Sequence, residues 1–350
     1  MNTAERLAYW FQKNKRSFPW RDHPSPYEVF VSEVMLQQTR ASVVIPYFEK
    51  WMQLFPDISS LAQAPLDKVI KAWEGLGYYR RAKNLHLAAQ KIVRDFASEI
   101  PSSRKDLESI KGLGPYTVGA LLSFGFKKRA LAIDGNVARV ITRFYAIEEN
   151  ICKRSTQRKI EEKVENLLDE KEPWITSEAL IELGATLCTP KNPLCEMCPL
   201  QKDCLGKEKA ELLPVRNQRE KTTFLQRWVL ILKQREAVLL KKEEEGKVMA
   251  GLYQFPFLEK GKNQGRKDLE SLLLSTFGVK VRWRRRLPLI KHSFTRFQVT
   301  LFPLEFEVLS AEKIEGHEWV HQNILETLAF SSGHRRVLHF WKQLLISKNR

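Results

Sequence analysis

Two glycines separated by one residue, Gly112 and Gly114, lie between two stretches of helical patterning and constrain the chain more than any other feature. Glycine adopts backbone angles that clash for other residues, and it leaves its N–H group uncovered. Pro115 follows, and proline suits the first turn of a helix because its missing donor costs little there. The pattern predicts a helix–turn–helix corner whose exposed amides form an anion site. An ordinary corner, with Asp134 as a plain N-cap of the next helix, is the alternative.

The chain is strongly basic, with 58 Lys and Arg against 41 Asp and Glu in 350 residues, a net charge of +17. Such an excess is typical of a protein with a polyanionic partner, either nucleic acid or a membrane surface. No stretch approaches the roughly 18 apolar residues of a membrane-spanning helix, and residues 1–16 lack the apolar core of a secretory signal. We therefore expect a cytoplasmic protein whose anion is a nucleic-acid phosphate.

Glu33 lies within a predicted helix at residues 27–39. At about 100° per residue, Glu28, Ser32 and Thr39 group on one side of this helix, and Glu33 falls opposite them among apolar side chains. A carboxyl there is either buried or faces a cleft. Burial raises the pKa of a carboxyl, so that it can act as a general acid near neutrality. A glutamate paired with an arginine at a helix–helix seam is the alternative.

Helical patterns fill the rest of the first 204 residues, and nothing there indicates a sheet. The expected helices are residues 1–22 (with a turn at Phe18–Arg21), 41–55, 66–74, 80–98, 137–147, 156–169 and 176–187. A second glycine corner, Gly75–Arg81, carries tyrosines and arginines, which suit nucleobases and the phosphate backbone. A C-cap glycine beside surface arginines is the alternative there.

Four cysteines follow in the spacing C-x6-C-x2-C-x5-C, namely Cys188, Cys195, Cys198 and Cys204. Four thiolates in so short a loop match either a [4Fe–4S] cluster or structural zinc. Zinc sites more often use two separated C-x2-C pairs, and only one such pair exists here, so the spacing leaves the metal open. The fifth cysteine, Cys152, is expected to be a small packed residue.

Beyond residue 222 the pattern changes to that of a separate α/β domain at residues 223–350. The charged stretch 205–222, interrupted by Pro214, predicts a linker. The expected elements are a hairpin at 227–233 and 237–241, strands at 280–284, 296–302 and 304–308, and helices at 267–277 and 334–347.

These motifs together resemble the helix-hairpin-helix DNA glycosylases, and most closely the MutY-type adenine DNA glycosylases. The resemblance spans nearly the whole chain, and its motifs are Pro19–Arg21, SEVMLQQT (32–39), GLGYYRRAKNLH (75–86), GLGPYTVGA (112–120), IDGNVARV (133–140), the four-cysteine loop and GLYQFP (251–256). It implies an α plus α/β multidomain fold. An all-α glycosylase region at 1–204 comprises a six-helix barrel module (about 27–134) and a cluster domain (1–26 with 135–204), and a Nudix-like domain follows the linker.

The resemblance implies a base-excision-repair enzyme that acts on double-stranded DNA and removes adenine mispaired with 8-oxoguanine or guanine. The target base must leave the stack to be reached. Glu33 resembles the acid that protonates adenine at N7 and later assists water. Asp134 resembles the carboxylate that stabilises the cationic sugar, in the manner of the paired carboxyls of glycosidases. Asn136 and Tyr116 resemble residues that position the water and the second carboxylate.

Further residues match positions that contact DNA in this family. They are Arg16, Trp20, Arg21 and Glu178 in the adenine pocket, Leu36, Gln38 and Thr39 at the duplex wedge, Tyr78 at 8-oxoguanine, Gly112 and Gly114 at phosphate, and Phe294 and Thr295 in a sensing loop of the C-terminal domain. Where the family has Phe-Ser-His in that loop, this chain has Phe294, Thr295 and Arg296, which puts discrimination between 8-oxoguanine and guanine in question.

Two further features refine the expected activity. In the related endonuclease III enzymes a lysine stands at the position of Tyr116 and attacks the sugar, whereas a phenol cannot form a Schiff base. We therefore expect a monofunctional glycosylase. We also expect a monomer, which would be nucleoid-associated if the protein is bacterial. Residues 251–275 lack the acidic Nudix signature, so the C-terminal domain is expected to recognise DNA without hydrolysing a nucleotide. The alternatives are a thymine-mismatch glycosylase of the same superfamily and a non-catalytic DNA-binding protein.

Overall fold

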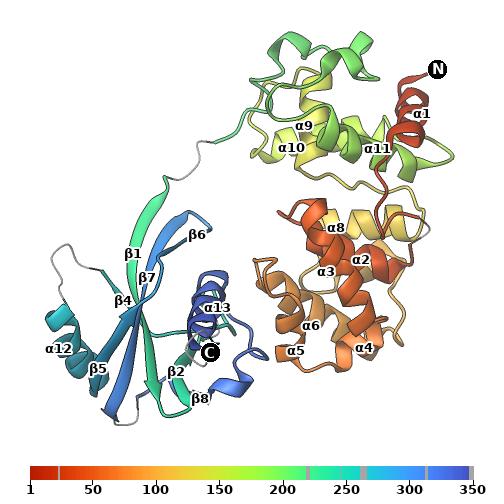
Figure 1. Ribbon diagram of the computed structural model, residues 1–350. Coiled ribbons are helices and arrows are strands. Elements are labelled where there is room, and N and C mark those ends of the chain that lie inside the picture. Colours follow the sequence, from red (N-terminus) through yellow and green to blue (C-terminus); the bar gives the residue numbers. More distant parts are fainter. Residues whose placement is uncertain (23, 218–220, 245, 261–265, 312–313, 347–350) are drawn as a thin grey trace. The chain divides into compact units, whose positions relative to one another are not determined.

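The computed structural model describes residues 1–22, 24–217, 221–244, 246–260, 266–311 and 314–346. The chain divides into two compact units. The first unit comprises Met1–Ala64 and Lys83–Gln218, and the second comprises Pro65–Ala82 and Arg219–Arg350. Figure 1 shows helices alone in the first unit, and the sheet in the second.

The described residues of the first unit form helices joined by loops and no strands, as the sequence predicted. Its helices are α1 (Thr3–Asn14), α2 (Pro26–Leu36), α3 (Ala41–Leu54), α4 (Ile58–Gln63), α6 (Arg80–Asp95, whose first three residues belong to the second unit), α7 (Arg104–Glu108), α8 (Pro115–Ala120) with a π-helical turn at Leu121–Gly125, α9 (Gly135–Phe144), α10 (Arg154–Glu165) and α11 (Pro173–Thr186). Short 3-10 turns follow at Cys195–Met197, Gln201–Asp203 and Lys207–Lys209. Helices α1, α9, α10 and α11 share one apolar core.

Helix α2 begins with a capping box in which Ser25 and Glu28 satisfy each other's backbone N–H groups, and Pro26 occupies its first turn. The predicted polar side of this helix is wrong at Ser32, which is 1% exposed and donates to the carbonyl of Val29. The helix is buried on nearly all sides because α3, α8 and the π-helical turn all pack against it. It ends at Leu36, three residues earlier than predicted, so Gln38 lies beyond it.

Residues 205–215, which fall in the predicted linker, pack against the first unit. The N–H of Leu205 donates to the carbonyl of Phe144 at 3.0 Å. The N–H of Ile151 donates to the carbonyl of Val215, also at 3.0 Å. Leu213 is buried and accepts from the guanidinium of Arg143. The described residues 205–215 therefore belong physically to the helical unit.

Cys152 is exposed in a turn before α10, so its predicted packing is wrong. Its N–H is held by the side chain of Asn150 at 2.9 Å. A turn residue at the surface has no core to enter.

The second unit contains helix α5 (Leu66–Ala72) and a mixed eight-stranded sheet. The strands are β1 (Thr223–Gln234), β2 (Ala237–Lys242), β3 (Tyr253–Gln254), β4 (Phe257–Glu259), β5 (Val279–Arg286), β6 (Ile290–Phe294), β7 (Phe297–Ala311) and β8 (Glu318–His321). The main order is β3-β2-β1-β7-β5, in which β1 and β7 are parallel. The strand β4 pairs with β1, β6 with β7, and β8 with β2.

Helices α12 (Arg266–Phe277) and α13 (Ser332–Ile346) cover opposite faces of this sheet (Figure 1). Successive residues of a strand point to opposite faces. Accordingly Val229 and Ile231 enter the core beside α13, whereas Leu230 and Leu232 enter the core beside α12. Residue 347, the last of the predicted final helix, lies outside the described residues.

The predicted break between strands at Pro303 is wrong, because β7 runs through it without interruption. Proline lacks the N–H that a sheet ladder needs. Pro303 sits where the antiparallel partner of β7 changes from β6, which pairs up to Leu301, to β5, which pairs from Leu304. The missing N–H of Pro303 therefore falls at the junction between β6 and β5, where neither of these two strands has a residue in register with it.

Candidate active site

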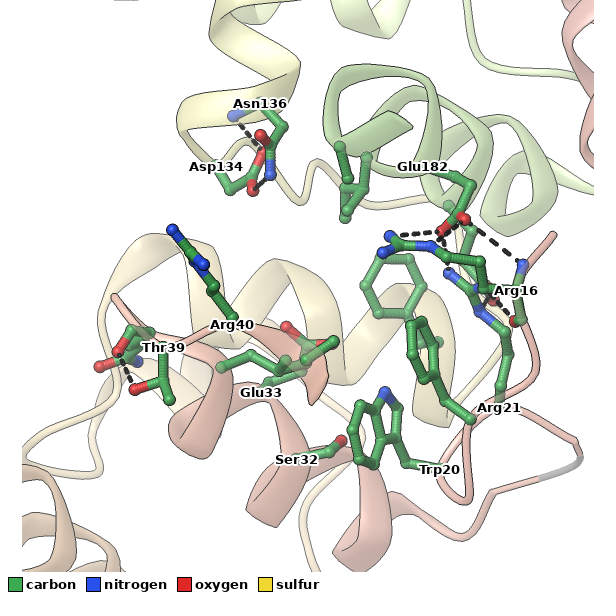
Figure 2. Close-up of a pocket in the computed structure, with 18 of the residues that line it drawn as sticks. Arg16, Trp20, Arg21, Ser32, Glu33, Thr39, Arg40, Asp134, Asn136 and Glu182 are labelled. Atoms are coloured by element: carbon green, nitrogen blue, oxygen red, sulfur yellow. Dashed lines mark hydrogen bonds and ion pairs between the residues drawn. The ribbon is translucent and has the colours of Figure 1, made fainter. Parts of the chain in front are cut away.

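A cavity of about 980 Å³ in the first unit gathers residues from the segment after α1, from α2 and the loop that follows it, and from α8, α9 and α11 (Figure 2). Eleven of the predicted site residues line it, namely Arg16, Trp20, Arg21, Glu33, Leu36, Gln38, Thr39, Tyr116, Asp134, Asn136 and Glu178. Residues more than a hundred positions apart in the sequence therefore meet in one cavity.

Glu33 is 8% exposed and faces this cavity from α2. The hydroxyl of Tyr116 donates to its Oε2 at 2.6 Å. The pKa of Glu33 is raised to about 7, mainly by burial and also by the nearby charges of Asp134 and Glu178, while the hydrogen bond from Tyr116 acts in the opposite direction. A carboxyl with such a pKa can hold and deliver a proton near neutrality.

Asp134 is both the N-cap of α9 and a lining residue of the cavity, so neither sequence interpretation excludes the other. Its Oδ1 accepts from the N–H groups of Asn136 and Val137, each at 2.8 Å, and its Oδ2 accepts from the amide of Asn136 at 2.7 Å. Burial raises the pKa of Asp134, while these hydrogen bonds act to lower it. The carboxylate is thereby fixed in orientation.

Two glycines allow the backbone segments around Asp134 to approach closely. A Cβ atom on Gly119 of α8 would lie 1.7 Å from the carbonyl oxygen of Leu131, in the chain that leads to Asp134. A Cβ atom on Gly184 of α11 would lie 2.6 Å from that of Asn136. Real Cβ atoms do not approach other atoms so closely, so both helices need glycine to hold Asp134 and Asn136 where they are.

Among the charged cavity residues that sequence reasoning missed is the buried Glu182 of α11, which lies against Arg16 and Arg21 (Figure 2). The available signal was its spacing from Glu178, because residues four apart share a face of a helix. Arg40 also lines the cavity and was not predicted.

The other predicted contacts lie elsewhere. Gly112 has φ +100° in the corner before α8, as expected for glycine, whereas Gly114 caps α8 with an ordinary φ of −83°. Tyr78 belongs to the second unit, is 49% exposed and has φ +49°. Phe294 ends β6, and Thr295, with φ +47°, lies in the turn before β7.

The four cysteines of the loop line a second, small cavity of about 30 Å³ in the first unit. The buried guanidinium of Arg143 donates to Cys188 Sγ at 3.3 Å and to the carbonyl of Thr189 at 2.7 Å. Burial raises the pKa of Cys198 to about 11, and the neighbouring thiols raise it further. Among the described residues, no three His, Cys, Asp or Glu side chains converge as a single-ion site. Four thiols around a cavity beside a fixed cation suit an anionic multi-atom group.

Comparison with known proteins identifies three parts of the chain. Residues 31–167 match the HhH-GPD superfamily of base excision DNA repair proteins, residues 188–204 match the iron-sulfur binding domain of endonuclease III, and residues 227–340 match the NUDIX domain. The solved structure of a thermostable thymine-DNA glycosylase aligns with a TM-score of 0.54 at 25% identity, over 59% of this chain and 95% of that one.

Relatives extend the match across both units. An adenine DNA glycosylase of Buchnera aphidicola (subsp. Schizaphis graminum) is 30% identical over 86% of this chain and 86% of its own length. Another, from Buchnera aphidicola (subsp. Baizongia pistaciae), is 32% identical over 71% of this chain and 72% of its own.

The chain belongs to the adenine DNA glycosylase family.

This adenine DNA glycosylase is thus a DNA N-glycosylase of base excision repair, and it acts on DNA. The predicted fold class is confirmed, with a helix-hairpin-helix core followed by a Nudix-like α/β domain. The predicted metal centre is confirmed as an iron–sulfur site. Within the described part of the chain, no helix has the length and apolar character needed to cross a membrane.

Proposed function

We propose that this adenine DNA glycosylase removes adenine paired with 8-oxoguanine or guanine, and that excision is purely hydrolytic. The observation that carries the proposal is the meeting of Glu33, Tyr116 and Asp134 in one cavity. That cavity is large enough, at about 980 Å³, to receive a base that has left the stack.

In the proposed mechanism Glu33 protonates the extruded adenine at N7. Adenine leaves poorly as an anion, so the proton must arrive as the glycosidic bond breaks. Because Oε2 of Glu33 accepts the hydrogen bond from Tyr116, the proton for adenine is proposed to be carried on Oε1. Asp134 then stabilises the cationic sugar electrostatically, as the second carboxylate of a glycosidase does. Asn136 holds Asp134 in place, and Glu33, now ionised, activates the attacking water.

The proposed absence of strand cleavage rests on the lining of the cavity. Cleavage through a Schiff base requires a nucleophilic amine. Within the described residues no lysine lines the cavity, and the phenol of Tyr116 is bound to Glu33. Burial, strengthened by the nearby Glu33 and Asp134, raises the pKa of Tyr116, so it stays a neutral donor.

For the iron–sulfur site we propose a [4Fe–4S] cluster held by Cys188, Cys195, Cys198 and Cys204. The match of residues 188–204 to the iron-sulfur binding domain of endonuclease III supports a cluster over a single zinc ion, and the four cysteines line one cavity. Hydrolysis of the glycosidic bond requires no electron transfer, so the cluster would supply no chemistry to base removal. The sulfur of Cys188 is placed to accept from Arg143. This supports a structural role.

Contacts with DNA are proposed both for residues that line the cavity and for residues elsewhere in the chain. Leu36, Gln38 and Thr39 lie at or just beyond the end of α2, where a wedge into the duplex would stand. Tyr78, together with Phe294 and Thr295, is proposed to contact 8-oxoguanine. Gly112 and Gly114 are proposed to contact a phosphate. Arg16, Trp20, Arg21 and Glu178 are proposed to contact adenine within the cavity.

The division into a glycosylase region, a linker and a C-terminal recognition domain remains our proposal, as do a monomeric state and a cytoplasmic location. Residues 261–265, in the stretch without an acidic Nudix signature, lie outside the described residues. The recognition role rests on that missing signature and on the turn at Thr295.

Single-turnover assays on duplexes with A opposite 8-oxoguanine, A opposite G and T opposite G test the proposal. We expect excision from the first two and none from the third, with no borohydride-trapped adduct. Glu33→Gln should abolish excision, while Glu49→Gln, an exposed glutamate on α3, should not. Excision of thymine, or full activity of Glu33→Gln, would overturn it. A protein that binds all three duplexes without excising any base would favour the non-catalytic alternative.

A further inference from the structure

Arg16, Arg21 and Glu182 lie together at one end of the active-site cavity (Figure 2). A second carboxylate of the cavity lining, that of Glu178, lies 3.7 Å from Nε of Arg21. Glu182 differs from the other three because its side chain is only 1% exposed, whereas that of Glu178 is 18% exposed and that of Arg16 is 45% exposed. An ionised carboxylate is almost never fully buried unless it is paired. The partners of Glu182 therefore explain its position.

Glu182 is shared between the two guanidinium groups. Its Oε1 accepts from Nε of Arg16 at 2.6 Å and from the backbone N–H of Arg16 at 3.3 Å. Its Oε2 accepts from Nη2 of Arg21 at 2.8 Å and from Nη2 of Arg16 at 3.3 Å. Burial acts to raise the pKa of Glu182, but the hydrogen bonds and charges of the two arginines outweigh it and lower the pKa. Glu182 is thus an anion at neutral pH.

The same contacts hold the arginines against an aromatic layer. The guanidinium groups of Arg16 and Arg21 lie over the ring of Phe18 at 5.1 and 5.0 Å. Phe18 in turn stacks on Trp20, with centroids 5.1 Å apart and planes at 11°. One buried carboxylate therefore orders a wall of the cavity made of two cations and two aromatic rings.

The charge of this wall reaches the proposed proton donor. The groups that face Glu33 are Tyr116 of α8, Asp134 at the start of α9, Glu178 of α11 and Arg21 of the segment after α1. Arg21 favours the ionised form of Glu33, whereas Asp134 and Glu178 disfavour it. Glu182 bonds to Arg21 directly and so offsets the positive charge that Arg21 exerts on Glu33.

We propose that Glu182 is a positioning residue for adenine excision, which fixes Arg16 and Arg21 as one charge-balanced wall and screens Glu33 from the positive charge of Arg21. The inference rests on the proposed role of Glu33 as the proton donor. Its distinguishing consequence concerns pH, because a merely structural residue would change the rate equally at every pH.

The test is the single-turnover rate of adenine excision from an A opposite G duplex, measured from pH 5.5 to 9. Excision needs protonated Glu33, so the rate falls as the pH rises through the pKa of that group. With Glu182→Gln, the positive charge of the arginines is no longer balanced and favours ionised Glu33. The fall in rate on the alkaline side of the pH–rate profile, the alkaline limb, should therefore move to lower pH. Each unit of movement lowers the rate above the limb about tenfold, whereas the rate well below it stays nearly unchanged.

Glu165→Gln is the matched control, because Glu165, at the end of α10, forms an exposed ion pair with Arg129 away from the cavity. Its alkaline limb should coincide with that of the unmodified protein. In the double variant Arg21→Gln with Glu182→Gln, one cation and one anion are lost together, and the limb should return toward its original pH.

A Glu182→Gln protein whose limb stays in place, or a double variant whose limb does not return, would overturn the proposal. If Glu182→Gln alone does not fold, the double variant is compared with Arg21→Gln, and its limb must lie at lower pH than that of Arg21→Gln. Glu33→Gln separates the two ideas. If it retains excision, the proton-donor role fails, and if it abolishes excision while Glu182→Gln leaves the limb in place, the inference about Glu182 alone fails.

Discussion

The hydroxyl of Tyr116 donates to the carboxyl of Glu33 at 2.6 Å across the wall of the active-site cavity. This bond joins α8, which follows the glycine corner, to the buried helix α2. Glu33 is buried and Tyr116 is partly buried, and each changes the proton affinity of the other. At the position where the resemblance to endonuclease III enzymes implies a nucleophilic lysine, this chain has a phenol that is hydrogen-bonded to Glu33.

Tyr116→Phe should move the alkaline limb of excision to higher pH. The hydrogen bond from Tyr116 lowers the pKa of Glu33, which burial has raised to about 7. Without that donor the pKa of Glu33 rises further, so the acid stays protonated to higher pH. The measurement is the single-turnover rate as a function of pH. A limb that moves to lower pH would contradict the assignment of Tyr116.

Glu33→Gln should make the protein more stable at alkaline pH. The pKa of Glu33 is about 7 in the folded protein against an ordinary value of 4.5. A carboxyl with a raised pKa stabilises the fold fully below its unfolded pKa, and that contribution is lost as the pH rises through 7. At about 1.4 kcal/mol per pKa unit, the variant should gain up to about 3 kcal/mol at pH 8.

Urea unfolding of Glu33→Gln and of the exposed Glu49→Gln at pH 5 and pH 8 measures this gain. The advantage of Glu33→Gln should shrink toward pH 5, and Glu49→Gln should match the unmodified protein at both. Equal stability of all three proteins at pH 8 would argue that Glu33 is not desolvated in solution.

Gly184→Ala should lower both stability and excision. The added methyl group would meet the Cβ of Asn136 at 2.6 Å, so α11 and α9 must separate. Overpacking of this kind costs about 1–3 kcal/mol, and it would displace the amide that orients Asp134. Gly114→Ala is the control for stability, since open space surrounds that position and its φ is −83°. The readouts are Tm and the excision rate, and an unchanged Tm for Gly184→Ala would refute the close contact.

Cys198→Ser should cost the protein its iron and inorganic sulfide, because Cys198 lines the four-thiol cavity. Cys152→Ser should retain both, because Cys152 is exposed and remote in sequence from the cysteine loop. Iron, zinc and sulfide analysis of the purified proteins checks this. Zinc without sulfide in the unmodified protein would replace the proposed cluster with a structural zinc site.

Local sequence patterns predicted much of this fold. The I-D-G-N stretch placed Asp134 at a helix start, the cysteine spacing located the iron–sulfur site, and the alternation after Arg227 identified the first hairpin. Each of these features depends on caps, periods or spacings among residues close in the chain. Among the predicted site residues, Glu33 and Asp134 were singled out by such patterns, whereas most of the others came from the family resemblance. The structure brings eleven of the predicted site residues to one cavity.

Tertiary structure decided what those patterns left open. Ser32 is buried because α3, α8 and the π-helical turn surround α2. Residues 205–215 join the helical unit because they exchange hydrogen bonds with α9 and with Ile151. Glu182 became part of the site only because Arg16 and Arg21, about 160 residues earlier, fold against it. The sequence by itself determined helices, strands, the cysteine loop and the candidate acids. Burial and charge balance came from packing between distant segments, because solvation and ion pairing depend on every neighbour in space.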